Sequence, residues 1–235
     1  MRVLVVTAVP VERDAVTRAS GAGSEVSVRR VPGAEIHRAG FFDVLAGGAG
    51  PAAAAASAAF ALAADRYDLV ISAGIGGGFT GLAPVGSLVV AGRIGAADLG
   101  AETPAGFVPV TDLGFGRVWH FPPRSLVRAV TDATRAVTGD ILTVSTVTGS
   151  AERAAALLAA HPGAVAEAME GFGVAEAADR LGLPVLEIRA VSNPVGPRDR
   201  DAWRIGDALA ALTDAFGTLI PVLEGWTTHH DRDHS

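Results

Sequence analysis

Short runs of β-branched and other apolar residues alternate along this chain with alanine-rich segments of helical length, and this alternation constrains the fold more than any other feature. It is typical of an α/β sheet covered on both faces, and it predicts a three-layer α/β/α sandwich. Several early strands follow one another without an intervening helix, so the central sheet should be mixed and strongly twisted. Strands are expected at residues 2–7, 25–31, 35–39, 42–47, 68–73, 87–94, 140–147, 164–168 and 185–192. Helices are expected at residues 10–19, 51–64, 123–137, 150–160, 171–181 and 205–224.

The chain is long and apolar enough to bury a sizeable core, since 49% of its 235 residues are hydrophobic. No change in composition marks a linker, and a single domain is expected over residues 1–226. Residues 227–235 mix histidine with charged residues and have no apolar period. They are expected to form a disordered tail.

Composition excludes several kinds of chemistry. There is no cysteine, which excludes thiol catalysis, disulfides and cysteine-ligated zinc. All 19 basic residues are arginine, so neither a Schiff-base lysine nor a P-loop is available. The 25 acidic residues outnumber the basic ones, which argues against nucleic-acid binding. The six histidines show no metal-ligand spacing, so no metal site is expected.

One long uncharged segment, Val44 to Ala64, raises the question of a membrane span. It consists mostly of alanine and glycine and contains Pro51, so its tendency to leave water is weak. The apolar run at the N-terminus is too short for a signal peptide, and no small-residue cleavage site precedes Glu12. We therefore expect a cytoplasmic protein that does not bind membranes.

Two long loops interrupt an otherwise compact pattern. Residues 95–122 combine glycines with Phe107, Phe115, Trp119 and Phe121, and the aromatic side chains favour a cover over a site. Residues 193–203 follow a strand and contain two prolines, two arginines and two aspartates. This second loop could also close on a ligand.

A glycine-rich segment, Gly74 to Gly78, follows the apolar run 69–73. Glycine at a strand end lets the backbone approach a ligand closely, which makes Gly74 a candidate substrate-binding residue. The segment is not a dinucleotide fingerprint, because Phe79 stands where the third glycine would be. The alternative is a simple tight turn.

Glu12 lies in the first turn of the helix expected at residues 10–19, just past the first strand. An acid at this position is commonly stabilised by the helix dipole alone. It would also face the crevice beyond the carboxyl ends of the strands, where α/β sheets bind ligands. There it could take a proton from water.

Two further acids, Glu167 and Glu170, stand among small and apolar residues, with no basic residue between Arg153 and Arg180. A buried carboxylate without a partner is costly, and accepting hydroxyl hydrogens from a bound sugar diol would offset part of that cost. Glu170, before a glycine at a strand end, is the better candidate. The alternative for Glu170 is a helix N-terminal acid.

Asn193 ends the apolar strand expected at residues 185–192 and precedes Pro194. An Asn-Pro pair is a frequent turn starter, so taken alone it needs no functional explanation.

Taken together and in order, four motifs resemble the purine nucleoside phosphorylase and nucleosidase superfamily. They are Glu12 after the first strand, the glycine segment 74–78, the pair Met169-Glu170, and Arg189-Ala190-Val191-Ser192-Asn193. The resemblance covers residues 1–224 and implies a nucleoside phosphorylase-like fold, a small-molecule nucleoside substrate, a homo-oligomer, and no cofactor.

The resemblance also implies roles for individual residues. Glu12 would activate the attacking water, while Met169 and Glu170 would hold the ribose. Main-chain groups around Val147 would contact the purine. In the adenine-specific nucleosidases an acid at the position of Asn193 protonates the leaving base, and here that acid is replaced by an amide.

The amide at position 193 favours a 6-oxopurine, because a 6-oxo group accepts hydrogen bonds whereas a 6-amino group donates them. With Glu170-Gly171-Phe172-Gly173 and Ser192-Asn193-Pro194-Val195-Gly196, the sequence looks like the futalosine hydrolase family of this superfamily. That resemblance implies hydrolysis of the N-glycosidic bond of futalosine, an inosine extended at its 5′ end by a carboxyphenyl ketone arm. The reaction would release hypoxanthine and dehypoxanthine futalosine in menaquinone biosynthesis. Three alternatives remain open: a methylthioadenosine/adenosylhomocysteine-type nucleosidase, a nucleoside phosphorylase, and a non-catalytic purine-binding protein.

Overall fold

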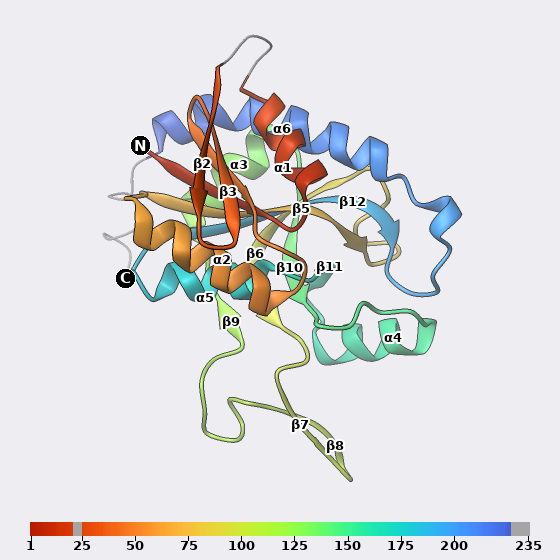
Figure 1. The fold of residues 1–235 in the computed structure, drawn as a ribbon. Coiled ribbons are helices and arrows are strands. Elements are labelled where there is room, and N and C mark those ends of the chain that lie inside the picture. Colours follow the sequence, from red (N-terminus) through yellow and green to blue (C-terminus); the bar gives the residue numbers. More distant parts are fainter. Residues whose placement is uncertain (21–24, 227–235) are drawn as a thin grey trace.

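The computed structural model describes residues 1–20 and 25–226, and within them one ten-stranded mixed sheet has helices on both faces (Figure 1). The expected tail, 227–235, lies outside the described residues. Along the path of the sheet the strands follow the order β11-β10-β6-β12-β5-β1-β4-β3-β2, and β9 pairs with β6. The strands are β1 (Val3–Thr7), β2 (Val26–Val31), β3 (Ala34–Ala39), β4 (Phe42–Ala46), β5 (Leu69–Gly78), β6 (Leu88–Ala96), β7 (Gly100–Thr103), β8 (Gly106–Pro109), β9 (Trp119–His120), β10 (Val137–Thr143), β11 (Ala164–Ala168) and β12 (Val185–Pro194). The helices are α1 (Pro10–Arg18), α2 (Pro51–Ala64), α3 (Arg124–Thr134), α4 (Ala151–Ala160), α5 (Gly171–Asp179), α6 (Ile205–Gly225) and a short 3₁₀ turn at Arg200–Ala202.

Two apolar cores lie on opposite faces of the sheet, as the three-layer prediction requires. Every residue of β1 is buried, and successive side chains point to opposite faces. Val3 and Val5 belong to the core beneath α1, α3 and α6, whereas Leu4 and Val6 belong to the core beneath α2 and α5. The expected α/β/α sandwich is therefore confirmed.

The expected mixed sheet is also confirmed. Strand β1 lies between β4 and β5 and is parallel to both, while β2, β3 and β4 form an antiparallel meander. Strand β12 is parallel to β5 and antiparallel to β6. Strand β11 pairs with β10 and, across the fold, with the end of β5, so that part of the sheet curls back on itself. This closure brings residues from β5, β11 and β12 together.

Three sequence-based assignments differ most from the structure. The glycine segment 74–78 is the end of strand β5, paired with β12 and β11, and is not a turn. The helix expected at residues 123–137 ends at Thr134, because Arg135 adopts the left-handed conformation (φ 56°) that terminates helices. The strand expected at residues 140–147 therefore begins and ends earlier, at Val137–Thr143.

The long loop at residues 95–122 contains the hairpin β7–β8 and the short strand β9, and in Figure 1 the hairpin extends away from the rest of the fold. Phe107, Phe115 and Phe121 are exposed on this segment. Trp119 is held by Arg93, whose guanidinium carbon lies 4.3 Å from the ring centroid.

One segment within the described residues, Arg200–Gly225, is long and apolar enough to cross a membrane by length and composition alone. Its helix, α6, packs against α1, α3 and β12 and buries Leu212, Phe216 and Leu219 in the core. Core helices commonly pass the same test, so the segment is weak evidence for a membrane span.

Candidate active site

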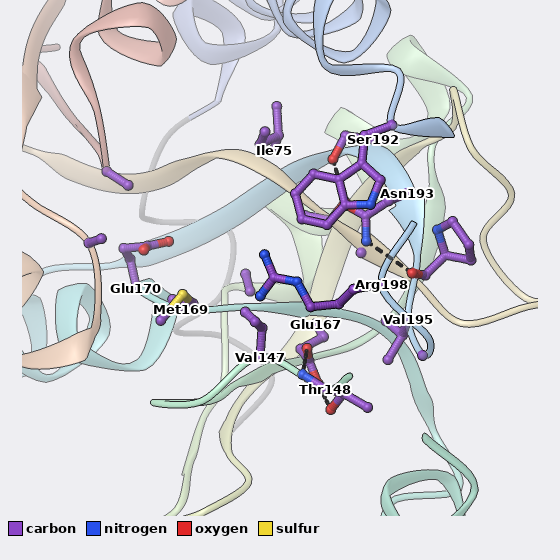
Figure 2. Close-up of a pocket in the computed structure, with 18 of the residues that line it drawn as sticks. Ile75, Val147, Thr148, Glu167, Met169, Glu170, Ser192, Asn193, Val195 and Arg198 are labelled. Carbon is purple, nitrogen blue, oxygen red and sulfur yellow. Dashed lines mark hydrogen bonds between the residues drawn. The ribbon is translucent and has the colours of Figure 1, made fainter. Parts of the chain in front are cut away.

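A cavity of about 240 Å³ opens where the loop after β1, the end of β5, the junction of β11 and α5, and the loop after β12 meet (Figure 2). Concave sites with a few convergent polar groups are the usual setting for small-molecule binding. Its lining residues are Ala8, Val9, Glu12, Ala49, Ile75, Gly76, Gly77, Val147, Thr148, Glu167, Ala168, Met169, Glu170, Ser192, Asn193, Pro194, Val195, Gly196, Pro197, Arg198 and Trp203.

Glu12 is buried at this cavity and its carboxylate is held entirely by backbone groups. Oε2 accepts hydrogen bonds from the N–H groups of Ala8 (2.9 Å) and Val9 (3.2 Å), and Oε1 accepts one from Ile75 (2.9 Å). Pro10 occupies the first turn of α1, where its missing N–H leaves no bond unmade. Burial raises the pKa of Glu12, and the Ile75 N–H opposes this shift. Glu12 therefore lies both in the first turn of α1 and at the cavity, so the two interpretations drawn from the sequence apply together.

Gly74 is the one predicted site residue that does not line the cavity. A Cβ atom at this position would lie 2.7 Å from Glu12 Oε1 and 2.8 Å from Arg189 Nη1. Gly74 therefore leaves room for these two side chains, and its role in substrate binding stays a prediction. Gly76 and Gly77, further along β5, line the cavity instead.

Glu170 precedes α5 and lies beside Met169 at one end of the cavity (Figure 2). Its Oε1 accepts a hydrogen bond from the Gly50 N–H at 3.2 Å, and its Oε2 accepts one from Arg189 Nη1 at 3.1 Å. The expectation of an unpartnered carboxylate was wrong, because the partner arrives from β12 and not from the neighbouring sequence. Carboxylate oxygens each accept more than one hydrogen bond, so Glu170 keeps capacity for ligand hydroxyls.

Arg189 is fully buried behind the cavity and is held from three directions. Its Nε donates to Glu187 Oε1 at 2.9 Å and its Nη2 donates to Ser72 Oγ at 3.0 Å, while Nη1 faces Glu170. Sequence reasoning included Arg189 in a motif but gave it no role. The structure makes it the cation that supports Glu170.

Asn193 stands at the end of β12 with a defined amide orientation. Its Oδ1 accepts a hydrogen bond from the Ser192 hydroxyl at 2.8 Å, and its Nδ2 donates to the Pro194 carbonyl at 2.9 Å. One Nδ2 hydrogen remains available to a ligand. The amide is thus ordered by its neighbours and lines the cavity, which goes beyond a turn-starting role.

Glu167 is a cavity residue that sequence reasoning passed over in favour of Glu170. Its carboxylate accepts hydrogen bonds from the Thr148 N–H (2.8 Å) and from the Thr148 hydroxyl, and burial raises its pKa. Gly77 of β5 pairs with Glu167 on one side and with Asn193 on the other. The signal in the sequence was an acid in the middle of the buried strand Ala164–Ala168.

The cavity therefore brings together five of the six predicted site residues, namely Glu12, Val147, Met169, Glu170 and Asn193. The loop at residues 193–203 contributes to the lining, as expected. The loop at residues 95–122 contributes none of the described lining residues, and the expectation that it covers a site stays a prediction.

Comparison with known proteins identifies the family. Residues 2–220 match the family model of the phosphorylase superfamily. The futalosine hydrolase of Streptomyces coelicolor is 66% identical over 97% of this chain and 99% of its own length, and that of Acidothermus cellulolyticus is 46% identical over 92% and 89%.

Solved structures agree on the fold. The futalosine hydrolase of Helicobacter pylori superposes with a TM-score of 0.81 at 16% identity, over 94% of this chain and 97% of that one. The methylthioadenosine/adenosylhomocysteine nucleosidase of Colwellia psychrerythraea, in complex with adenine, superposes with a TM-score of 0.78 at 23% identity, over 93% and 96%. This chain belongs to the phosphorylase superfamily and, within it, to the futalosine hydrolase family.

Proposed function

We propose that this protein hydrolyses the N-glycosidic bond of futalosine, a 6-oxopurine nucleoside, and releases hypoxanthine and dehypoxanthine futalosine. The observation that carries the proposal is the amide of Asn193, ordered in the cavity where it faces Glu167 across Gly77. Membership of the futalosine hydrolase family supports the same substrate.

Recognition of the base follows from this arrangement. Neighbouring strands lie about 4.8 Å apart, so Glu167 and Asn193 are separated by two strand spacings, about 10 Å. A flat base with a hydrogen bond at each end fits such a span, and Gly77 has no side chain to obstruct it. A 6-oxopurine donates from N1–H, which suits the Glu167 carboxylate, and accepts at O6 and N7, which suits the Asn193 amide. N1 of a 6-aminopurine is an acceptor, so it would face the Glu167 carboxylate with no hydrogen between the two acceptors.

The ribose is anchored by Glu170, next to Met169. A carboxylate that accepts from two vicinal hydroxyls forms short, charge-assisted hydrogen bonds. Arg189 offsets part of the cost of burying the Glu170 charge. The sugar is then held while positive charge develops on it as the glycosidic bond breaks.

Glu12 deprotonates the attacking water. Glycoside hydrolysis passes through an oxocarbenium-like transition state, and a carboxylate base with a raised pKa accepts a proton more readily near neutral pH. The neutral Asn193 stabilises the departing hypoxanthine through its one remaining Nδ2 hydrogen, which N7 and O6 can share. Because an amide cannot supply a proton, the base obtains it from solvent or through water.

The same geometry disfavours phosphorolysis. A phosphate that attacked the anomeric carbon would have to lie beside the Glu12 carboxylate, and like charges repel strongly in a poorly solvated site. Arg189, the nearby cation, is already engaged with Glu187, Glu170 and Ser72. Arg189 is the arginine whose charge acts on Glu12 in the described structure, so its engagement leaves the repulsion of a phosphate by Glu12 in place.

The test is to incubate the protein with futalosine, inosine and methylthioadenosine, each with and without phosphate. We expect hypoxanthine release from futalosine to be fastest and independent of phosphate. A rate that rises with phosphate, together with a ribose 1-phosphate product, would identify a phosphorylase. Faster cleavage of methylthioadenosine would identify the adenine-specific nucleosidase alternative, and absence of turnover on all three would favour a purine-binding protein.

The proposal extends to the setting of the reaction. Residues 1–226 act as a single nucleosidase domain, in the cytoplasm, as a homo-oligomer and within menaquinone biosynthesis. Light scattering of the purified protein checks the oligomer, and loss of menaquinone on deletion of the gene checks the pathway.

A further inference from the structure

Arg198 is the one cation among the residues described as lining the cavity, which also contains three carboxylates. Glu12, Glu167 and Glu170 each have their own donors, as described above. In the described part of the chain Arg198 forms no ion pair or hydrogen bond with any protein group, and its recorded contact is with an aromatic ring. A guanidinium left free at a substrate cavity predicts an anionic group on the substrate.

Arg198 is positioned without being neutralised. Its guanidinium carbon lies 5.4 Å from the centroid of the Trp203 ring, an arrangement that keeps the N–H donors free. Its aliphatic stem passes over Gly149, where a Cβ atom would lie 3.9 Å from both Cγ and Cδ. Figure 2 shows the side chain directed from the loop after β12 toward the end of the cavity that holds Met169 and Glu170.

The position of Arg198 relates it to one part of a nucleoside. With the base held between Glu167 and Asn193 and the ribose hydroxyls on Glu170, the 5′ substituent has to leave through the open side of the cavity. Arg198 is exposed there, and Trp203 is half-buried. An indole face and a guanidinium together suit an aromatic acid, with the ring against Trp203 and the carboxylate in bidentate contact with the guanidinium.

We propose that Arg198 binds the carboxylate of the carboxyphenyl arm on the 5′ side of futalosine, and so determines specificity for an acidic nucleoside. This inference rests on the proposed function. It assigns the groups that contact the 5′ arm: Arg198 for the charge and Trp203 for the ring.

The test compares R198Q with R200Q. Arg200 also lies over the Trp203 ring, at 5.7 Å, but it does not line the cavity, which makes it a matched control. We expect R198Q to lower kcat/KM for futalosine about 10- to 100-fold, mainly through KM, the size of a lost hydrogen bond between charged groups. For inosine, which lacks the arm, the loss should be less than about threefold, and R200Q should change neither substrate by more than that. R198K should recover part of the loss on futalosine.

A third substrate, the methyl ester of futalosine, isolates the charge. Wild-type protein should prefer the acid to the ester by a factor similar to the R198Q loss, and R198Q should not distinguish them. Equal losses on futalosine and inosine in R198Q, or equal wild-type rates on acid and ester, would overturn the assignment of Arg198 while leaving the proposed function intact. Wild-type protein that cleaves inosine but not futalosine would overturn the proposed function, and this inference with it.

Discussion

At the scale of single residues, the proposed base specificity depends on the identity of residue 193. An amide donates a hydrogen bond without giving up a proton, whereas a protonated acid can do both. The ordering of the Asn193 amide by Ser192 and Pro194 presents Nδ2 to the cavity. Under the proposed function, this one atom distinguishes a site for hypoxanthine from one for adenine.

Asn193→Asp should shift preference from 6-oxo toward 6-amino nucleosides. A carboxylate would face the lone pairs of O6, and an unsatisfied buried polar group typically costs about 1–3 kcal/mol. We expect kcat/KM for futalosine to fall about 10- to 100-fold and that for its 6-amino analogue to rise. Measuring both substrates with both proteins tests this, and an unchanged ratio would reduce Asn193 to a turn starter.

Glu12→Gln should lower kcat about 10²- to 10⁴-fold, the usual contribution of a general base, and leave KM for futalosine nearly unchanged. The raised pKa of Glu12 also has a kinetic consequence. The rate should fall as pH drops through a value above the ordinary 4.5 of a glutamate, and this acidic limb should be absent from E12Q. Wild-type turnover in E12Q would contradict the assignment of the base.

Sequence reasoning found most residues of the candidate site but few of their partners. Glu12, Met169, Glu170 and Asn193 follow strand ends, where α/β sheets gather functional side chains, and this position could be read from the apolar pattern. The pairing of Glu170 with Arg189 could not, because it depends on which strands become neighbours.

At the scale of elements, the glycine-rich end of β5 is the least conventional segment. Strand β5 pairs on both edges, yet it ends in three consecutive residues without side chains, Gly76, Gly77 and Gly78. These glycines line the cavity or pack tightly against other elements. Glycine usually weakens a strand and marks a close approach of ligand or backbone. A turn was predicted here because the segment is rich in glycine, and the pairing with β12 and β11 overrides that local preference.

Gly74→Ala should impair catalysis more than stability. Its Cβ would overlap Glu12 Oε1 and Arg189 Nη1, which are both held by hydrogen bonds. We expect kcat to fall about 10- to 100-fold because a misplaced base loses alignment, with a loss of about 1–3 kcal/mol in the free energy of unfolding.

Gly92→Ala is the matched control for Gly74→Ala. It lies on strand β6, and its new Cβ would meet Gly139 O at an ordinary 3.6 Å. Steady-state kinetics and thermal denaturation of the two variants should therefore diverge, with Gly92→Ala close to wild type. Equal activities would show that the space at Gly74 is not needed.

Element boundaries show the limits of local signals. The helix at Pro51–Ala64 is found at its predicted bounds, because a proline opens it and an alanine-rich run without glycine or further proline follows. The predicted end of α3 was wrong because Arg135, not a glycine, takes the left-handed position, and arginine carries no termination signal there.

At the scale of the whole molecule, one buried arginine supports several carboxylates. Arg189 contacts Glu187 and Glu170, and its charge also acts on Glu12. Glu187 is fully buried, and its Oε2 has no hydrogen-bond partner in the described structure. Burial raises the pKa of Glu187 to about 7, and the charge of Glu170 acts in the same direction. Such a cluster makes stability depend on pH.

Glu187→Gln should change the pH dependence of stability in a defined direction. Because the pKa is raised on folding, the contribution of Glu187 to the free energy of unfolding is most favourable below pH 4.5 and is lost as pH rises toward about 7. A glutamine does not titrate, so the Tm of E187Q relative to wild type should increase between pH 4.5 and 7. A constant difference in Tm over this range would contradict the shifted pKa.

The layers of the fold were predictable, because they follow from the alternation of apolar segments along the chain. The pairing of strands that are distant in sequence was not predictable. Nothing in the sequence near β11 indicates that Glu167 will lie opposite Gly77, ninety residues earlier in the chain. The closure of the sheet decides where the cavity lies, and so the position of Glu167 within the site could be read only from the structure.

Every hydrogen bond described for the Glu12 carboxylate comes from a backbone N–H group, which affects the substitutions that this site tolerates. Main-chain N–H groups of residues 8, 9 and 75 persist whatever non-proline side chains these positions carry. Substitution of these side chains therefore leaves the donors to Glu12 in place, so the base keeps its orientation. Mutational constraint falls instead on Gly74, where any added atom would displace Glu12.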